Sequence, residues 1–161
     1  MHSKDTEVKS GDMRRPLSST VISSIVFIGA GPSTTAALTN LLQELEKGKV
    51  TKTGLKITVV ENNPPFGPGL AYGTEEPYHL FNSRANKVGI VSGDRNHFFK
   101  WMLQNKDLWK EKFPECASTP LQSYSFVPRG LYGIYLRDMF NSAIEGFREI
   151  GVDARTVLGE A

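Results

Sequence analysis

A glycine turn that joins an apolar strand to an amphipathic helix constrains this chain more than any other feature of its sequence. The run Ile22–Ile28 is rich in β-branched residues, as is typical of a strand buried on both faces in a parallel sheet. The sequence Gly-Ala-Gly-Pro-Ser-Thr follows at positions 29–34. Apolar residues then recur at helical spacing up to Gly48, a residue type that ends helices: Ala37, Leu38, Leu41, Leu42 and Leu45. The order predicts the first β-α step of an α/β fold.

The residues of this turn suit the binding of a diphosphate. Gly29 permits the tight turn, and Gly31 lacks the Cβ that would keep a diphosphate away from the backbone. Pro32 suits a first helical turn, while Ser33 and Thr34 can add hydroxyl donors to the free N–H groups at the positive end of the helix. An ordinary tight turn would use the same residues. Thr34 also replaces the third glycine of the dinucleotide-binding motif Gly-x-Gly-x-x-Gly, which predicts a slightly wider crossing of helix and strand.

A carboxylate closes the next predicted strand. The run Lys56–Val60 is rich in β-formers and ends at Glu61. In a nucleotide-binding βαβ unit, an acid at this place accepts hydrogen bonds from a ribose. Glu61 follows Gly29 by more than the ~20 residues of a compact fingerprint, and the polar insert at 47–54 accounts for most of the excess. The alternative is a solvated glutamate at the end of a strand.

Four spaced motifs follow Glu61. They are Phe-Gly-Pro-Gly-Leu-Ala-Tyr-Gly at 66–73, His-Leu-Phe-Asn at 79–82, Phe-x-x-Trp at 98–101 and Val-Pro-Arg-x-x-Tyr-Gly-x-Tyr-Leu at 127–136. With the glycine turn and the strand-ending glutamate, in this order, they resemble a family of bacterial flavoproteins that carry an FAD/NAD(P)-binding domain. The resemblance covers about residues 22–158.

The resemblance implies a set of cofactor-binding residues. Those near the FAD diphosphate would be Gly29, Gly31, Pro32, Ser33 and Thr34, with Glu61 on the adenosine ribose. The 67–73 loop, including Gly69, Ala71 and Tyr72, would lie toward the cofactor together with Asn82, and Arg129 would contact the flavin side or a phosphate.

Without the resemblance, the loop and the arginine say less. The prolines and glycines of 64–73 predict a shaped loop rather than a helix or strand, for which a structural Ω-type excursion is the alternative. Arg129 lies near a predicted helix N-terminus, where a cation is unfavourable, and this favours an anionic partner.

The rest of the chain predicts two more helices and a third strand. Asp94 or Asn96 can cap a helix that continues to about Leu108, and its apolar face is expected to belong to the core: Phe98, Trp101 and Met102. His97 is expected to be a solvated or capping residue. From Tyr132, apolar residues at i, i+3 and i+4 predict a helix that ends at Gly151, and residues 152–158 resemble the third strand of a right-handed parallel sheet.

Composition limits the partners. The 161 residues are 39% hydrophobic and carry a formal net charge of +2 without a block of one sign, which predicts one folded domain and argues against nucleic acid or an anionic membrane as partner. Cys116 is the only cysteine and the three histidines lack the spacing of a zinc pair, so we expect no disulfide within the chain and no metal site. A reducing, cytoplasmic location is compatible with this composition.

These observations give an expected domain organisation. Residues 1–20 are polar and are expected to be a disordered N-terminal tail, with a secretory signal as the minor alternative. Residues 21–161 are expected to be the N-terminal part of an FAD/NAD(P)-binding domain with a Rossmann-like parallel sheet and a βαβ dinucleotide-binding unit. Proteins of the resembled family continue past this point. An incomplete sheet would expose apolar surface, so self-association is expected.

The predicted function is that of the FAD-binding N-terminal region of a flavin-dependent oxidoreductase or monooxygenase-like protein, reduced by NAD(P)H when complete. Because flavin chemistry resides in the cofactor, no catalytic acid or base is assigned. One alternative is an S-adenosylmethionine-dependent methyltransferase, which Pro32 and the 67–73 loop fit poorly. The other is a non-catalytic nucleotide-binding module.

Overall fold

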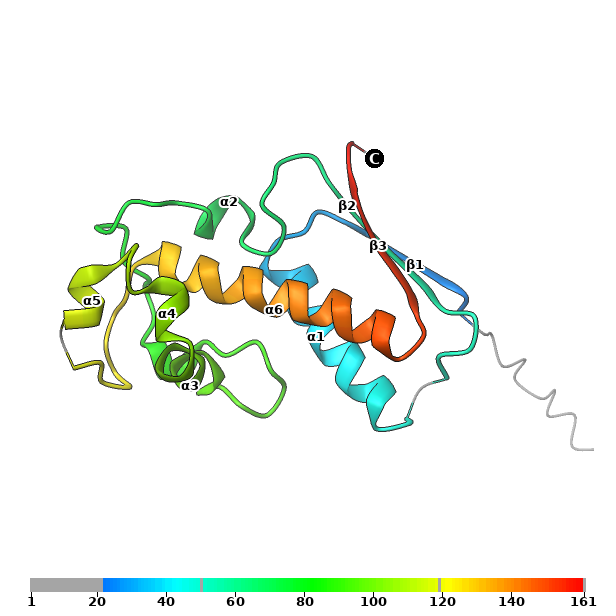
Figure 1. The fold of residues 1–161 in the computed structure, drawn as a ribbon, viewed down its shortest axis with the longest axis horizontal. Coiled ribbons are helices and arrows are strands. Elements are labelled where there is room, and N and C mark those ends of the chain that lie inside the picture. The colour runs from blue at the N-terminus through cyan, green and yellow to red at the C-terminus, as the bar shows by residue number, and fades with distance from the viewer. Residues whose placement is uncertain (1–21, 50, 119, 161) are drawn as a thin grey trace, which may run out of the picture.

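The computed structural model describes residues 22–49, 51–118 and 120–160 (Figure 1). The expected N-terminal tail, residues 1–20, lies outside these ranges. Strands and helices alternate first, then a helical region follows, and a last strand returns to the first two. The elements in order are β1 (Ser24–Ile28), α1 (Pro32–Glu46), β2 (Lys56–Glu61), α2 (Gly69–Tyr72), the 3-10 turn η1 (Ala85–Lys87), α3 (His97–Gln104), α4 (Lys106–Trp109), α5 (Pro114–Ser118), α6 (Arg129–Glu149) and β3 (Asp153–Leu158).

The three strands form one parallel sheet in the order β1-β2-β3. The register aligns Ile28 with Val60 and Val60 with Val157, so the carboxyl ends of all three strands meet at one edge. Each connection runs through a helix, as parallel neighbours require. The predicted Rossmann-like parallel α/β fold is thereby confirmed.

Helices α1 and α6 pack against each other and cover one face of the sheet. Two central residues of β2, Ile57 and Val59, are fully buried under them. The cluster also includes Leu38 of α1 and Phe147 of α6, both fully buried. As predicted, α1 is followed by Gly48 and α6 by Gly151, and both glycines have positive φ.

No described element covers the opposite face of the sheet. Val26 and Ile28 of β1 are 57% and 65% exposed there, and Val157 of β3 is 41% exposed. The expectation that the first strand is buried on both faces is therefore wrong for this chain, because β1 lies at the edge of the sheet with helices on one side only.

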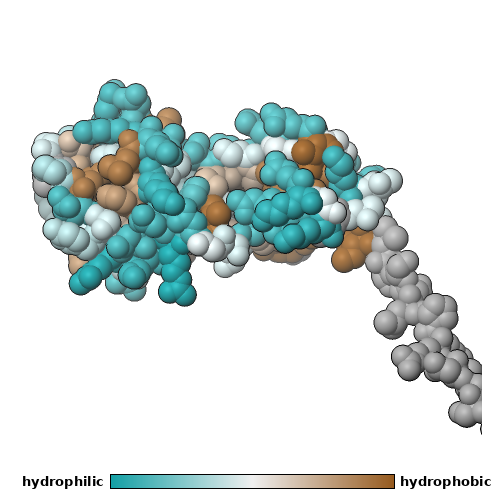
Figure 2. Space-filling view, turned by 90° about the horizontal axis from the view of Figure 1, so that it is seen from below, coloured by the Kyte–Doolittle hydropathy of each residue, from teal (hydrophilic) through white to brown (hydrophobic). Residues whose placement is uncertain are grey.

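A second apolar cluster lies beside the sheet layer. It joins α3, α4 and the first half of α6 and is rich in aromatic side chains. Helix α6 runs through both clusters, contributing Tyr132 and Tyr135 to this one and Phe140 and Phe147 to the cluster under the sheet. Figure 1 shows α6 crossing the middle of the molecule, and Figure 2 shows the two resulting lobes side by side.

The helix predicted over residues 94–108 is two helices instead. Asn105, with φ −115° and ψ 36°, leaves the helical region between α3 and α4, and its side-chain amide donates to the Trp101 carbonyl at 3.0 Å. The apolar face holds as predicted, since Phe98, Trp101 and Met102 are buried. No side chain at Asn96 caps α3.

His97 also differs from its expected solvated or capping role. Its ring is half-buried, and Nδ1 lies 2.9 Å from the Tyr135 hydroxyl, which in turn accepts a bond from the Ile90 N–H. Burial lowers the pKa of His97. The residue thus connects α3 to α6.

Candidate functional site

The predicted strand, glycine turn and helix are present, with α1 beginning directly at Pro32. Gly29 has φ +88°, a conformation that residues with a side chain rarely adopt. The first intrahelical bond runs from the Thr35 N–H to the Gly31 carbonyl at 3.0 Å. The turn therefore delivers the start of α1 to the carboxyl edge of the sheet.

Some of the amides in this turn are used within the chain and some are free. The Gly29 N–H donates to the Val60 carbonyl at 2.8 Å, and the Ala30 N–H donates to Glu61 Oε2 at 2.8 Å. The N–H groups of Gly31, Ser33 and Thr34 have no acceptor in the part of the chain that the structure describes. These three donors lie at the positive end of a 15-residue helix, an arrangement that attracts anions.

The carboxylate of Glu61 lies directly beside the glycine turn. Besides the bond from Ala30, its Oε1 accepts the Asn63 N–H at 2.9 Å. These backbone hydrogen bonds lower the pKa of Glu61, because they stabilise the charged form. An ionised carboxylate has about four lone-pair positions, so Glu61 can still accept hydroxyl donors from a ligand.

A cavity of about 390 Å³ opens at this edge of the sheet. In open α/β sheets, the crevice outside the carboxyl ends of the strands is the usual ligand site. The cavity is lined by the ends of all three strands and the residues that follow them: Ile28, Gly29, Val60, Glu61, Asn62, Gly159 and Glu160.

Gly31 has free space where a side chain would be. Its φ of −84° is open to any residue, and a Cβ built there would meet only the Gly69 Cα, at 3.9 Å. The fold itself does not require glycine at this position. The absence of a side chain instead leaves the backbone approachable from outside.

The 67–73 loop is attached to the glycine turn. The Gly67 N–H donates to the Ala30 carbonyl at 2.7 Å, and the buried Thr35 hydroxyl lies 3.1 Å from the Gly31 carbonyl and 3.3 Å from that of Gly67. The sequence did not predict this role of Thr35. The feature that could have indicated it is a hydroxyl side chain on the buried side of the first helical turn. These bonds make the turn and the loop one unit.

Thr34, at the place of the third glycine, has a role within the turn. Its hydroxyl donates to the Gly29 carbonyl at 2.6 Å. The side chain therefore closes the turn, while its backbone N–H remains free. The loop also differs from the expectation of irregular structure throughout, because Gly69–Tyr72 form the one-turn helix α2.

From Gly67 the chain runs along α6 toward the start of that helix. A Cβ at Gly67 would lie 2.8 Å from the Arg137 Cα, so the two backbones touch there. Farther along, Cβ atoms at Gly133 and Gly130 would overlap the carbonyl oxygens of Tyr72 and Thr74. Glycines on α6 thus let the 72–74 backbone lie directly on the helix.

The other predicted site residues lie along this path. Ala71 is exposed on α2, whereas the Tyr72 ring packs against Phe81 and Tyr132 with centroids 5.4 and 5.0 Å away. Asn82 is exposed. Arg129 starts α6, where its N–H donates to the His79 carbonyl at 2.7 Å and its Nε to the Leu80 carbonyl at 3.2 Å.

The predicted residues therefore form two groups rather than one. Gly29, Gly31 and Glu61 are together at the strand ends, and Asn82 and Arg129 are in the second lobe. The loop attached to the glycine turn touches α6 at Arg137, where a Cβ at Gly67 would lie 2.8 Å from the Arg137 Cα. Arg129 is eight residues from Arg137, about 12 Å along the helix axis. A ligand that touches both groups must be elongated.

The described residues also bear on metal binding and on membrane insertion. No three His, Cys, Asp or Glu side chains there come together as a metal site would require. Over the same ranges, no helix has the length and apolar character needed to span a bilayer.

Comparison with known families gives one match. A family model described as FAD-NAD(P)-binding matches residues 26–161, and no curated protein matches the chain. The matched region begins in β1 and includes the glycine turn, Glu61 and the segment along α6.

Proposed function

This chain belongs to the FAD-NAD(P)-binding family, and from that premise we propose that the strand-end cavity holds the adenosine half of FAD. The FAD diphosphate lies against the start of α1 in this proposal, with the free N–H groups of Gly31, Ser33 and Thr34 as donors. Gly29 and Pro32 shape the turn without donating to the ligand, since the Gly29 N–H is already used and proline has none.

The observation that carries the proposal is the open space at Gly31. Among the described residues, chain neighbours aside, the nearest atom to a Cβ built at Gly31 is the Gly69 Cα at 3.9 Å, and the unpaired N–H groups of Gly31, Ser33 and Thr34 belong to the same turn. A diphosphate is an anion that needs close approach to bare backbone, and glycine at this place allows it.

Glu61 is the proposed ribose ligand. Its two N–H partners fix the carboxylate beside the turn and keep it ionised, which makes it a pure acceptor. The two ribose hydroxyls are donors, so the hydrogen-bonding roles are complementary. The position at the end of the second strand of a βαβ unit is the one where such an acid acts.

The flavin half of the cofactor extends along α6 in this proposal. The path passes Gly69, Ala71 and Tyr72 and reaches Asn82 and Arg129 in the second lobe. An extended dinucleotide has the elongated shape that the separation of the two groups requires. Arg129 supplies the positive charge near that end, and its Nε bond to Leu80 holds the side chain in place.

The proposed activity is that of a flavin-dependent oxidoreductase, with residues 21–161 as the N-terminal part of its FAD/NAD(P)-binding domain. Flavin, when bound, supplies hydride and electron transfer, which NAD(P)H would feed in the complete protein. The residues of this chain bind and orient the cofactor. The cytoplasm is the proposed compartment, on the support of a single cysteine and no disulfide pair.

We also propose that the uncovered sheet face mediates self-association. Parallel sheets are nearly always covered on both faces, and here Val26, Ile28 and Val157 are exposed on one of them. A second copy of the chain would remove this apolar surface from water.

A calorimetric titration of the full chain with FAD tests the proposed function. Saturable binding of FAD, with weaker binding of S-adenosylmethionine, is the expected result. Gly31→Asp should abolish FAD binding, because it places a carboxylate where the diphosphate lies. Binding of S-adenosylmethionine without FAD would overturn the proposal in favour of a methyltransferase.

A further inference from the structure

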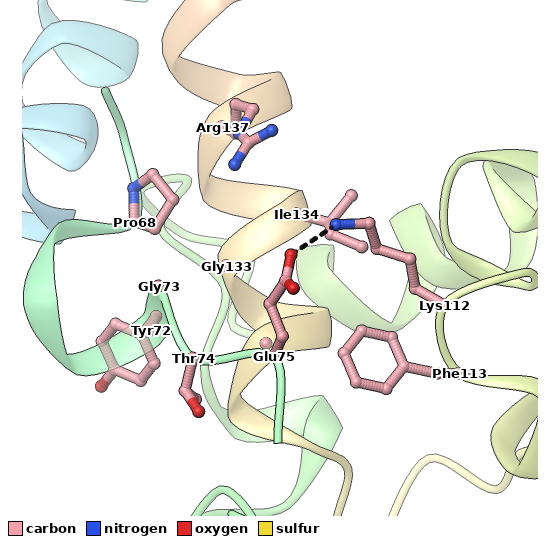
Figure 3. Close-up of a pocket in the computed structure, with 11 residues that line it drawn as sticks. Pro68, Tyr72, Gly73, Thr74, Glu75, Lys112, Phe113, Gly133, Ile134 and Arg137 are labelled. Carbon is pink, nitrogen blue, oxygen red and sulfur yellow. Dashed lines mark hydrogen bonds and ion pairs between the residues drawn. The ribbon is translucent and has the colours of Figure 1, made fainter. Parts of the chain in front are cut away.

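A second pocket, of about 200 Å³, lies on the side of α6 that carries Arg137. Figure 3 shows Tyr72–Glu75 along one wall, α6 as the floor, and Lys112 and Phe113 on the opposite side. Arg137 lies on α6 above Ile134, at one end of the pocket. None of the residues proposed to bind the FAD diphosphate or ribose lines this space.

The walls of this pocket are fixed by main-chain packing. A Cβ at Gly133 would overlap the Tyr72 carbonyl, and a Cβ at Gly130 would overlap the Thr74 carbonyl and lie 2.8 Å from the Phe113 ring. Close backbone contact of this kind holds the 72–75 segment on the helix. Main-chain packing therefore sets this wall of the pocket.

The charged groups around the pocket do not balance. Lys112 Nζ is paired with Glu75 Oε1 at 2.9 Å across the opening (Figure 3). Among the described residues, Arg137 has no carboxylate within 4.0 Å. Lys112, through its hydrogen bond and charge, and then the Arg137 charge lower the pKa of Glu75. Within the described part of the chain, the pocket thus has one cation in excess, because Glu75 is its only carboxylate and is already paired with Lys112.

From this arrangement we propose that the pocket binds a small molecule through a compact oxyanion, a carboxylate or phosphate group, held by Arg137. The guanidinium presents its donors in a planar fork that fits such groups in a bidentate manner. The volume of about 200 Å³ has room for a compact group such as a phosphate ion or a small dicarboxylate. Tyr72, which lies on the proposed flavin path, also lines this pocket, but the oxyanion site does not require FAD to be bound.

Glu75 is an internal competitor of that ligand. Its carboxylate forms an ion pair with Lys112. An entering oxyanion meets Arg137 directly and attracts Lys112 away from Glu75. Removing the Glu75 charge should therefore strengthen binding, whereas removing the Arg137 charge should weaken it. Glu75→Gln and Arg137→Gln, two substitutions in one pocket, should change oxyanion affinity in opposite directions.

The test is a calorimetric titration of the full chain at low chloride, with inorganic phosphate in one arm and succinate in the other. We expect saturable binding of at least one probe. Arg137→Gln should weaken it by about ten-fold, the loss typical of one charged hydrogen-bonded contact. Glu75→Gln should tighten it. Arg95→Gln, which removes an exposed charge elsewhere, is the matched control and should leave affinity unchanged.

Three results would overturn the proposal. The first is the absence of saturable binding of both probes. The second is a change in the same direction for Glu75→Gln and Arg137→Gln, or an equal loss in Arg95→Gln, since both indicate a general charge effect. The third is an equal loss of FAD affinity in Arg137→Gln, which would make Arg137 part of the cofactor site. Because Glu75 and Arg137 are both exposed, circular dichroism should show unchanged folding.

Discussion

The main-chain N–H of Ala30 donates to Glu61 Oε2 at 2.8 Å. This bond joins the glycine turn after β1 to the acid at the end of β2, across 31 residues of sequence. It brings the diphosphate-binding and ribose-binding elements of the proposed site into direct contact. It also means that the carboxylate is positioned before any ligand arrives, so binding does not have to order it.

Gly31→Ala should separate cofactor binding from folding. The added Cβ meets only Gly69 at 3.9 Å and the φ of −84° suits alanine, so urea unfolding should give a free energy close to that of the wild type. FAD affinity, measured by calorimetry, should fall by at least ten-fold, since the methyl group occupies the approach of the diphosphate.

Gly29→Ala is the matched comparison. Its φ of +88° is strained for alanine, so unfolding free energy should drop by about 1–3 kcal/mol. If Gly31→Ala bound FAD as well as the wild type, the assignment of the diphosphate to this turn would be wrong.

The hydrogen bonds to Glu61 predict a pH-dependent contribution to stability. Its pKa is lowered in the folded state, so the contribution is present above the ordinary value of 4.5 and is lost as pH falls through the lowered pKa. In urea unfolding from pH 7 to pH 3, the difference between the wild type and Glu61→Gln should be constant above pH 4.5 and shrink below it. A difference that does not change with pH would contradict the bonding described here.

The contact between α6 and the 72–74 segment predicts different outcomes for two glycines of one helix. Gly133→Ala should destabilise the chain by about 2 kcal/mol, because the methyl group overlaps the Tyr72 carbonyl. Gly146→Ala meets only the flexible end of Leu42, and alanine favours the helix, so it should stay within about 1 kcal/mol of the wild type. Urea unfolding measures both, and equal effects would argue against the close backbone packing.

The uncovered sheet face predicts self-association that depends on specific side chains. A double variant, Val26→Thr with Ile28→Thr, should shift sedimentation velocity profiles toward the monomer. Leu103→Thr with Leu108→Thr removes side chains that are 57% and 52% exposed in the second lobe and serves as the control. Profiles that respond equally to both pairs would remove the sheet face as the contact.

Sequence patterns predicted the parts of the fold that depend on local chemistry. The strands ending at Ile28 and Glu61, the helix after Pro32 and the long helix before Gly151 follow from periodicity and turn residues. The same reasoning located the turn and the acid, because a βαβ unit brings consecutive strand ends together.

Features that depend on contacts between distant segments were not predictable. Two such features arise only when the 67–74 segment lies on α6. One is the bond from the Thr35 hydroxyl to the Gly67 carbonyl, and the other is the close approach of the Tyr72 carbonyl to Gly133. The break at Asn105 is similar, because no proline or glycine marks it in the sequence. The aromatic stripe continued on both sides of this break, so the apolar pattern did not reveal it.

The central claim is that free amides at the start of α1 hold the FAD diphosphate. Its most direct test is to follow backbone amide resonances of the ¹⁵N-labelled chain during titration with FAD. The amides of Gly31, Ser33 and Thr34 should show the largest shifts, with smaller ones at Gly29, whose N–H is already bonded to Val60. FAD binding that leaves those three resonances unmoved would contradict the account.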